Sequence, residues 1–212
     1  MSVKRKFAAS IDLSLREALE GDLDDLISSG ELLKNDKTTT VAKVGLAGVE
    51  VVIKRYNARS LGHRFKRALR QSRAMRCWLM SKKFESAGLQ VAPRLAMVEK
   101  RLGPFRLDAY FIAQWVEANE LLAWLPEQSS EQKKSVKQQI VHIFSAFKQY
   151  RLSHGDMKAT NLLWKEGQIV FLDLDAATQH ESIVLWQRGY RRDKKRFAKN
   201  GDSFADLVSG VS

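Results

Sequence analysis

The alternation of apolar and polar positions predicts an N-terminal helix followed by a β-rich stretch. In residues 11–29 apolar side chains recur near helical spacing, and the Ser-Ser-Gly sequence at 28–30 ends the run. After it come β-branched segments separated by polar or glycine-containing turns. Three strands are predicted there: residues 31–34, 38–44 and 49–56.

Two longer segments show the pattern of amphipathic helices. Residues 64–87 keep one face apolar and carry arginine and lysine on the rest, and Gly88 is placed to end that helix. Residues 130–152 repeat the apolar stripe. The remaining predicted elements are strands at 91–98 and 109–116, a short helix at 121–125, a hairpin formed by 161–164 and 168–174, and a helical tail after Asp175.

The order of these elements predicts two lobes in an α+β protein. We expect an N-lobe over residues 1–113, which includes the N-terminal helical segment, a hinge over 114–120 and a mostly helical C-lobe over 121–212. No internal repeat is visible, so a repeat architecture is not expected.

Composition narrows the class of protein. The chain has 212 residues, of which 44% are hydrophobic, and this is too apolar for general disorder. A single cysteine excludes an internal disulfide framework and a four-cysteine zinc site, and it suits a reducing cytosol. No apolar run approaches the roughly 18 residues of a membrane span, and none has the features of a signal peptide. We therefore expect a soluble intracellular protein.

The net charge of +12 is unevenly distributed. Residues 11–36 hold eight acids and two bases, whereas residues 51–84 hold eleven bases and no acid. Residues 188–199 add seven bases against Asp193 alone. Such segregation attracts nucleic acid, anionic lipid or phosphorylated glycans, although a solvated surface would look the same.

Residues 154–161, His-Gly-Asp-Met-Lys-Ala-Thr-Asn, carry the candidate chemistry together with Asp173. If Glu166 and Gly167 form the hairpin turn, Asn161 and Asp173 lie nearly opposite each other, about 5 Å apart between backbones. Their oxygens then suit one Mg²⁺ ion that keeps phosphate oxygens as further ligands.

Two further residues of this segment suit phosphoryl transfer. Asp156 is expected on the loop beside the cation, as the group that orients a hydroxyl and accepts its proton. Lys158 is expected to neutralise the transferred oxygens. His154 is interpreted as a structural residue beneath Asp173, and Asp175 either as an acid behind the metal site or as a helix N-cap.

This pattern resembles the catalytic loop and the metal-binding motif of the protein-kinase-like fold, over residues 31 to about 200. The resemblance rests on His154, Asp156, Lys158, Asn161 and Asp173. It implies a bilobal fold with a β-rich N-lobe and a small, mostly helical C-lobe. It also implies that Lys54, which ends the sequence Val-Val-Ile-Lys, holds the α- and β-phosphates of ATP.

Within that fold the chain is most similar to the bacterial lipopolysaccharide kinases, the Kdo and heptose kinases of the inner core. The shared features are the loop just quoted, Asp-Leu-Asp at 173–175 and the basic cluster at 191–197. The resemblance implies an enzyme that uses ATP and Mg²⁺ to phosphorylate a sugar hydroxyl of an anionic glycolipid. It also implies a cytoplasmic protein in peripheral contact with the anionic inner membrane.

The sequence departs from the kinase pattern at two places. There is no glycine-rich phosphate loop, and the equivalent turn at 35–38 leaves Lys37 and Thr38 as the expected nucleotide contacts. The helix glutamate that normally pairs with the strand lysine is replaced by Cys77, which we interpret as a small buried hydrophobe. Gln114 and Val116 are expected in the connector that meets adenine.

Two alternatives to a lipopolysaccharide kinase remain open from the sequence. One is another kinase-like phosphotransferase that acts on a small molecule or a protein, although only 39 residues follow Asp173 and no Ala-Pro-Glu occurs there. Another is a non-catalytic, kinase-like module with a membrane or regulatory role, which Cys77 and the missing glycine loop favour. A nucleic-acid partner fits the charge but no recognition motif, so it is not expected.

Overall fold

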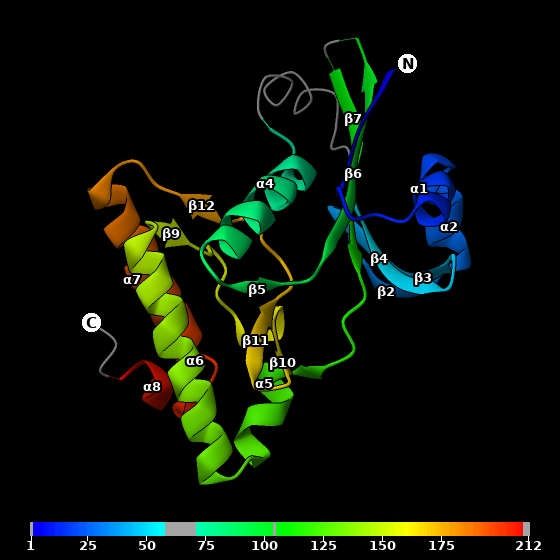
Figure 1. Cartoon of the computed structure of the whole chain (residues 1–212). Helices are drawn as coiled ribbons and strands as arrows, with labels where there is room; N and C mark the ends of the chain where they lie inside the picture. Colours follow the sequence, from blue (N-terminus) through cyan, green and yellow to red (C-terminus); the bar gives the residue numbers. More distant parts are fainter. Residues whose placement is uncertain (1, 58–70, 104, 210–212) are drawn as a thin grey trace. The chain divides into compact units, whose positions relative to one another are not determined.

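The computed structural model describes residues 2–57, 71–103 and 105–209 of the chain. It shows antiparallel sheets combined with helices, which confirms the mixed α/β composition of the predicted class (Figure 1). By its internal contacts the chain divides into two compact units. The first unit contains Met1–Trp78 and Ala92–Val116, and the second contains Leu79–Val91 and Glu117–Ser212.

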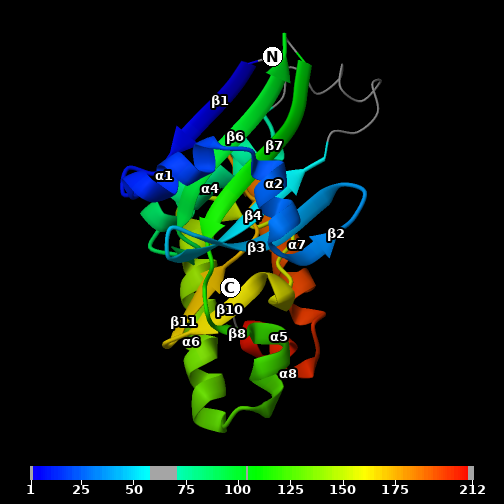
Figure 2. The same ribbon diagram turned by 90° about the vertical axis from the view of Figure 1, so that its right-hand side faces the viewer.

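The first unit is built on a six-stranded antiparallel sheet with the strand order β1-β6-β7-β4-β3-β2. Val51 and Ile53 of β4 are fully buried on one face, where they pack with residues from two short helices. Figure 2, which views the molecule from the side of these helices, shows α2 in front of β4. The elements are β1 Ser2–Phe7, α1 Leu13–Glu20, α2 Leu23–Ser29, β2 Glu31–Asn35, β3 Thr39–Leu46, β4 Val49–Tyr56, β6 Arg94–Leu102 and β7 Phe105–Gln114.

The single helix predicted over residues 11–29 is wrong, because the segment forms two helices. Gly21 ends α1 with an extended backbone, and Asp22 starts α2 by accepting a hydrogen bond from the Asp24 amide. Glycine and an N-cap aspartate are a stop signal followed by a start signal. The apolar positions continue across the break, which is why their spacing resembles one helix.

The first strand was not predicted at all. β1 pairs with β6 along its whole length, from Ser2 opposite Arg101 to Phe7 opposite Ala96. The three predicted strands between residues 31 and 56 are confirmed with small shifts at their ends. β3 and β4 are joined by a tight turn at Ala47 and Gly48, both of which have positive φ.

Helix α4 (Arg73–Ser86) corresponds to the later part of the helix predicted over 64–87. Residues 58–70 lie outside the described residues, and Gln71 and Ser72 are not helical. Gly88 ends the helix as predicted: it has a φ of 76°, and Leu89 donates a backbone hydrogen bond to Phe84.

In the second unit, helices α5 (Leu121–Trp124) and α6 (Ser130–Gln149) pack against the hairpin β10–β11 (Figure 1). The hairpin predicted around Glu166 and Gly167 is confirmed, with Leu162 opposite Phe171. The predicted helix at 130–152 ends at Gln149, because Leu152 and Ser153 pair with β12. The remaining elements are β5 Gln90–Val91, β8 Asn119–Glu120, α5 Leu121–Trp124, η1 Leu125–Glu127, α6 Ser130–Gln149, β9 Leu152–Ser153, η2 Ala159–Asn161, β10 Leu162–Lys165, β11 Gln168–Phe171, β12 Thr178–Gln179, α7 Ile183–Ala198 and α8 Asp202–Val208.

Aromatic side chains form the centre of this second unit. Phe84 contacts Phe147 and Phe171 edge to face, and Phe144 meets Tyr190 of α7 in the same way. Trp186 donates from Nε1 to the Phe147 carbonyl at 3.0 Å, which ties α7 to α6. Within the described ranges, no helix combines the length and the apolar character needed to cross a bilayer.

Candidate active site

The segment from His154 to Asn161, called the candidate loop below, runs from β9 to β10 in the second unit. Met157 and Ala159 are fully buried and anchor it to the core. Gly155 has a φ of 84°, and a Cβ at this position would lie 2.4 Å from the Ala176 carbonyl oxygen. Only glycine fits this turn without displacing its neighbour.

Within the loop, three predicted site residues lie together. The Asp156 carbonyl accepts from the Lys158 amide at 2.7 Å and from Asn161 Nδ2 at 2.9 Å. The Asp156 carboxylate oxygen Oδ2 lies 3.5 Å from Lys158 Nζ and 3.4 Å from Asn161 Nδ2. The backbone turn therefore places a carboxylate, an ammonium group and an amide beside one another.

Asp173 lies just beyond the other strand of the hairpin. The Leu172 amide donates to the Asn161 carbonyl at 3.0 Å, so the strand partner of Asn161 directly precedes Asp173. Asp173 Oδ1 accepts from the Asp175 amide at 3.2 Å. The suggestion that Asp175 is a helix N-cap is wrong, since the next helix, α7, is capped by Ser182.

The donor set at the end of this hairpin fits Mg²⁺. Asn161 and Asp173 offer an amide oxygen and a carboxylate, and Nδ2 of Asn161 is turned toward Asp156, which directs its oxygen to the other side. In the part of the chain that the structure describes, no three histidine, cysteine, aspartate or glutamate residues cluster as metal ligands. An all-protein cage is thus absent there, and Mg²⁺ often keeps phosphate oxygens and water instead of one.

Helix α7 and the residues directly after it hold the candidate loop at three points, which were not predicted from the sequence. Asp193 accepts from the amides of His154 at 2.6 Å and Gly155 at 2.9 Å. Arg196 Nε lies 2.5 Å from Asp156 Oδ1. Asn200, just after the helix, accepts from the Ala159 amide at 3.2 Å.

The sequence contains a feature from which the contact of Asp193 with the candidate loop could have been predicted. Asp193 is the only acid among the seven bases of residues 188–199. It also falls on the apolar stripe of α7, in register with Trp186, Tyr190 and Phe197, all of which are buried. An acid on a buried stripe needs donors, and the candidate loop supplies them.

Burial shifts the pKa of two groups beneath the loop. Desolvation raises the pKa of the Asp193 carboxyl to about 6, although the His154 and Gly155 amides and Arg192 oppose it. Desolvation lowers the pKa of His154 to about 4 against the attraction of Asp173 and Asp156. His154 is therefore neutral at pH 7.

His154 itself is fully buried and packs 5.4 Å from the Phe171 ring, between ring centroids. Its Nδ1 accepts from the Asp156 amide at 3.3 Å, so Nε2 carries the proton. Nε2 is buried and has no hydrogen-bond partner among the described residues. This position agrees with the structural role expected for His154.

The expected nucleotide contacts Lys54, Lys37, Thr38, Gln114 and Val116 all belong to the first unit. Lys54 is half-buried on β4, and its Nζ lies 5.2 Å from the centre of the Tyr56 ring. Cys77 is buried and lies 3.1 Å from the Tyr56 hydroxyl, in keeping with its interpretation as a small buried residue.

A buried acid that the sequence did not single out lies on the same face of the sheet as Lys54. Tyr56 lies opposite Ala109 on β7, and Ala109 lies opposite Glu99 on β6, so these three residues share one face of the sheet. Lys54 lies on that face too, because it is two residues from Tyr56 along β4. Glu99 is 2% exposed and accepts from the Ser72 hydroxyl and from Arg101. Ser72 in turn accepts from the Met75 amide, so Glu99 helps to hold the start of α4.

The β2–β3 turn, which stands where kinases have a glycine-rich loop, is organised by Asp36. Its Oδ1 accepts from the amides of Thr38 at 2.7 Å and Thr39 at 2.8 Å and from the Thr38 hydroxyl at 2.8 Å. These hydrogen bonds, chiefly those from Thr38, hold the pKa of the Asp36 carboxyl well below its usual range. Backbone donors that cradle a phosphate in a glycine-rich loop are here bound to a carboxylate.

The connector residues lie at the end of β7. The Gln114 amide donates to the Pro93 carbonyl at 2.8 Å, and the Trp115 amide donates to the Glu50 carbonyl at 2.9 Å. Val116 follows at the boundary between the two units, which falls between Val116 and Glu117. The segment is therefore extended and tied to the sheet up to Trp115.

The family model described as the lipopolysaccharide kinase (Kdo/WaaP) family matches residues 28–206, and the chain belongs to that family. Among curated proteins, none matches the sequence significantly.

A solved structure, "WaaP in complex with acyl carrier protein", shares the fold with a TM-score of 0.63. Its sequence is 11% identical, and the alignment covers 98% of this chain and 94% of that one. The resemblance to the lipopolysaccharide kinases is therefore confirmed at the level of the family, and the likeness to WaaP at the level of the fold.

Proposed function

We propose that this protein is an ATP- and Mg²⁺-dependent kinase that transfers the γ-phosphoryl group to a sugar hydroxyl, Kdo or heptose, of the lipopolysaccharide inner core. It acts as a bilobal, kinase-like enzyme in the cytoplasm, in peripheral contact with the anionic inner membrane. The observation that carries the proposal is the grouping of Asp156, Lys158 and Asn161 on one loop beside Asp173, in a member of this family.

Asp156 is the proposed base. Its carboxylate accepts a hydrogen bond from the acceptor hydroxyl and orients the oxygen toward the γ-phosphorus. It takes the proton as the new P–O bond forms and the bond from the γ-phosphorus to the β,γ-bridging oxygen breaks, which releases ADP. Lys158, 3.5 Å from that carboxylate, donates to the oxygens of the transferred group and offsets their charge.

The proposed contacts of the nucleotide are the side chains and the connector segment that the resemblance to kinases implies. Lys54 donates to the α- and β-phosphates, the connector around Gln114 and Val116 meets the adenine, and the side chains of Lys37 and Thr38 lie near the phosphates. Asn161 and Asp173 would hold Mg²⁺, and the ion would supply positive charge to neutralise the phosphate oxygens. Because Asp36 already binds the turn amides, Lys54 carries more of the phosphate binding than it would beside a glycine-rich loop.

Variants that separate binding from chemistry test this proposal. We expect Lys54→Ala and Asp173→Ala to abolish the thermal stabilisation by ATP with Mg²⁺, because each removes a phosphate or metal contact. Asp156→Asn should retain that stabilisation and lose turnover, since an amide accepts no proton. Lys165→Ala and Asp206→Asn, both on exposed positions, are the matched controls. Full phosphoryl transfer by Asp156→Asn would rule out Asp156 as the base.

A second candidate function is a non-catalytic, kinase-like module. It is favoured by the occupied amides of the β2–β3 turn and by Cys77 in place of a helix glutamate. It predicts that the wild-type protein shows no thermal stabilisation by ATP with Mg²⁺, whereas the kinase proposal requires one.

An acyl carrier protein is a candidate partner because the structural neighbour was solved with one. Size-exclusion chromatography of the full chain mixed with a purified acyl carrier protein tests whether the two proteins form a complex. Separate elution at micromolar concentrations of both proteins would exclude a stable complex.

A further inference from the structure

The first turn of α7 exposes three consecutive apolar side chains. Ile183, Val184 and Leu185 are 54%, 52% and 54% exposed, and the core begins only at Trp186, which is 9% exposed. Three consecutive helical residues span more than half of the helix circumference, so they face different directions. Nowhere else in the described ranges are three consecutive large hydrophobic residues exposed. The turn therefore projects from the second unit, with apolar side chains on several sides.

Beyond this turn, the exposed surface of α7 is basic. Arg188, Arg191 and Lys195 follow Val184 by four, seven and eleven residues, so they continue the same stripe of the helix, and all three are exposed. The only acid in α7 is Asp193, which is fully buried and bound to the candidate loop. The exposed surface of the helix thus joins an apolar end to an uninterrupted row of positive charge.

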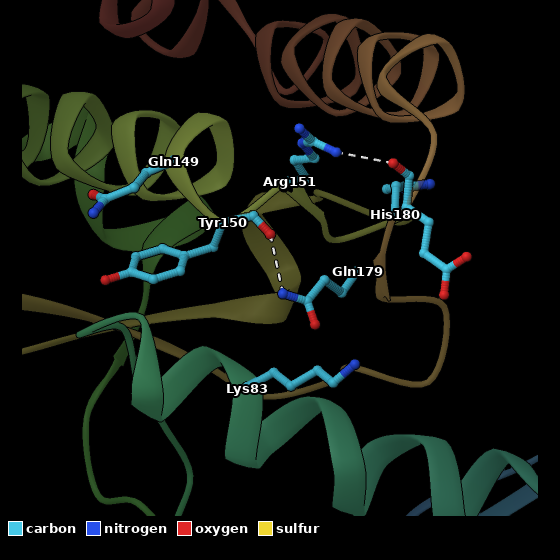
Figure 3. Close-up of a pocket in the computed structure, with 7 residues that line it drawn as sticks. Lys83, Gln149, Tyr150, Arg151, Gln179 and His180 are labelled. Atoms are coloured by element: carbon cyan, nitrogen blue, oxygen red, sulfur yellow. Dashed lines mark hydrogen bonds between the residues drawn. The ribbon is translucent and has the colours of Figure 1, made fainter.

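A polar groove of about 430 Å³ is lined in part by the residues that directly precede the apolar turn in the sequence (Figure 3). Lys83 and Arg151 line it with His180 and Glu181, the last of which precedes Ile183 by two residues. Arg151 Nη1 donates to the Glu181 carbonyl at 2.9 Å, which fixes one cation beside the start of the helix. The groove beside the turn therefore carries hydrogen-bond donors and positive charge. It also contains one exposed acid, Glu181.

We propose that the first turn of α7 and the basic stripe Arg188, Arg191 and Lys195 form the surface that docks the protein on an anionic membrane. Ile183, Val184 and Leu185 enter the boundary between headgroups and acyl chains, and the stripe lies at the level of the lipid phosphates. This inference rests on the peripheral membrane contact in the proposed function and names the residues that make it.

Two properties of the surface favour a bilayer over a protein partner. A bilayer surrounds an inserted turn on all sides, whereas a protein interface covers one face and would leave part of this turn in water. The charge of the exposed α7 surface has one sign, which complements anionic headgroups along the whole stripe.

Co-sedimentation of the full chain with vesicles tests the assignment. The probes are vesicles of phosphatidylethanolamine with phosphatidylglycerol and vesicles of phosphatidylcholine alone. Ile183→Ser, Val184→Ser and Leu185→Ser combined should lower partitioning onto the anionic vesicles at least tenfold. The matched control is Leu32→Ser with Leu33→Ser, an exposed apolar pair at 53% and 42% in the first unit, which should partition like the wild type.

The charge of the stripe is tested separately. Replacing Arg188, Arg191 and Lys195 together with Gln should remove most of the preference for anionic over neutral vesicles and reduce its dependence on salt. Ile183→Cys labelled with an environment-sensitive dye should show a blue shift on anionic vesicles, since the native Cys77 is buried.

The outcomes distinguish failure of this α7 surface as the docking site from failure of the proposed membrane contact itself. If the wild type binds anionic vesicles and the triple serine variant binds equally well, this surface is not the docking site. If the serine variant instead loses self-association with unchanged vesicle binding, the turn contacts a second copy and the inference is wrong. If the wild type does not bind anionic vesicles, the membrane contact in the proposed function fails, while phosphoryl transfer to a soluble inner-core oligosaccharide still tests the kinase. The serine variant should keep that soluble activity, because its residues lie outside the candidate active site.

Discussion

Arg196 gives the proposed base a partner that the sequence motif does not include. Its Nε lies 2.5 Å from Asp156 Oδ1, while Lys158 Nζ lies 3.5 Å from Oδ2. An ion pair this close restricts both the position and the rotamer of a carboxylate. Arg196 therefore acts as a positioning residue for Asp156.

We expect Arg196→Gln to lower kcat about tenfold, which corresponds to about 1.4 kcal/mol, because Asp156 is then less well oriented. The KM for ATP should change little, since Arg196 is not among the expected nucleotide contacts. Steady-state kinetics with a soluble acceptor measures both constants. Lys199→Gln, an exposed base directly after the same helix and outside the docking stripe, is the matched control. A loss of thermal stability with an unchanged kcat in Arg196→Gln would show a purely structural role.

Asp193 makes stability depend on pH in a direction unusual for an aspartate. Its pKa is raised from 3.8 to about 6 by burial, so the folded protein binds this proton more tightly than the unfolded chain does. The contribution of Asp193 to the free energy of unfolding therefore falls as pH rises from about 4 to about 6 and is constant above that range. A shift of this size corresponds to about 3 kcal/mol.

Asp193→Asn removes this titration while keeping the shape of the side chain. The difference in the free energy of unfolding, wild type minus variant, should decrease by up to about 3 kcal/mol between pH 4 and pH 6. Urea denaturation at several pH values measures it. The titration of His154 is common to both proteins and cancels to first order in the difference. A pH-independent difference would contradict the raised pKa of Asp193.

The local geometry of the candidate loop was predictable from the sequence, but the contacts that hold it were not. The spacing from Asp156 to Asn161 and the hairpin turn at Glu166 are local features, and the structure shows the expected hairpin. Asp193 and Arg196 reach the loop across 37 or more residues of sequence. Such a contact depends on how α7 packs against β9, which a local pattern does not encode.

At the scale of elements, helix α2 is fixed to the sheet of the first unit by Asp24. Its carboxylate accepts from Arg55 at 2.9 Å, from Lys100 at 3.0 Å and from the Tyr110 hydroxyl at 2.8 Å. Burial alone would raise the pKa of Asp24, but the hydrogen bonds from Lys100, Arg55 and Tyr110 lower it overall. Burial and this carboxylate together raise the pKa of the Tyr110 hydroxyl.

Asp24→Asn should lower the free energy of unfolding by about 1–3 kcal/mol. The substitution removes the anionic acceptor of three hydrogen-bond donors and places an amide NH₂ group, itself a donor, beside them. Asp25→Asn, on the same helix and exposed, should change it by less than about 0.5 kcal/mol. Chemical denaturation of the two variants measures both values. Equal stability of the two variants would show that the Asp24 contacts contribute nothing to anchoring α2.

The patterns of apolar residues predict some helices and strands correctly and miss others. Strands β3 and β4 alternate clearly between buried and more exposed positions, and their prediction is confirmed. Strand β1 carries three bases in six residues and lies at one end of the strand order, so its pairing with β6 comes from a partner more than 85 residues away. The division of the predicted N-terminal helix into α1 and α2 depends on Gly21 and the cap at Asp22, which apolar spacing does not register.

For the whole molecule, the structure separates the bases that hold the fold from those on the surface. Arg55 pairs with Asp24, and Arg196 pairs with Asp156. Arg64, Lys66, Arg67 and Arg70, which belong to the predicted basic face, lie outside the described residues. Within the described part, the exposed bases of α7 and the exposed Arg76, Lys82 and Lys83 of α4 supply the surface charge that favours an anionic partner.

The family of the chain follows from its sequence over residues 28–206, whereas its substrate depends on chemistry that only an assay reveals. The central claim is that Asp156 is the base for transfer of a phosphoryl group from ATP to an inner-core sugar. The most direct test is incubation of the full chain with labelled ATP, Mg²⁺ and purified inner-core lipopolysaccharide, followed by mass spectrometry of the glycan. The wild type is predicted to add one phosphoryl group to a Kdo or heptose residue, and Asp156→Asn is predicted to add none. An unmodified glycan with the wild type, or an equally phosphorylated glycan with Asp156→Asn, would contradict the claim.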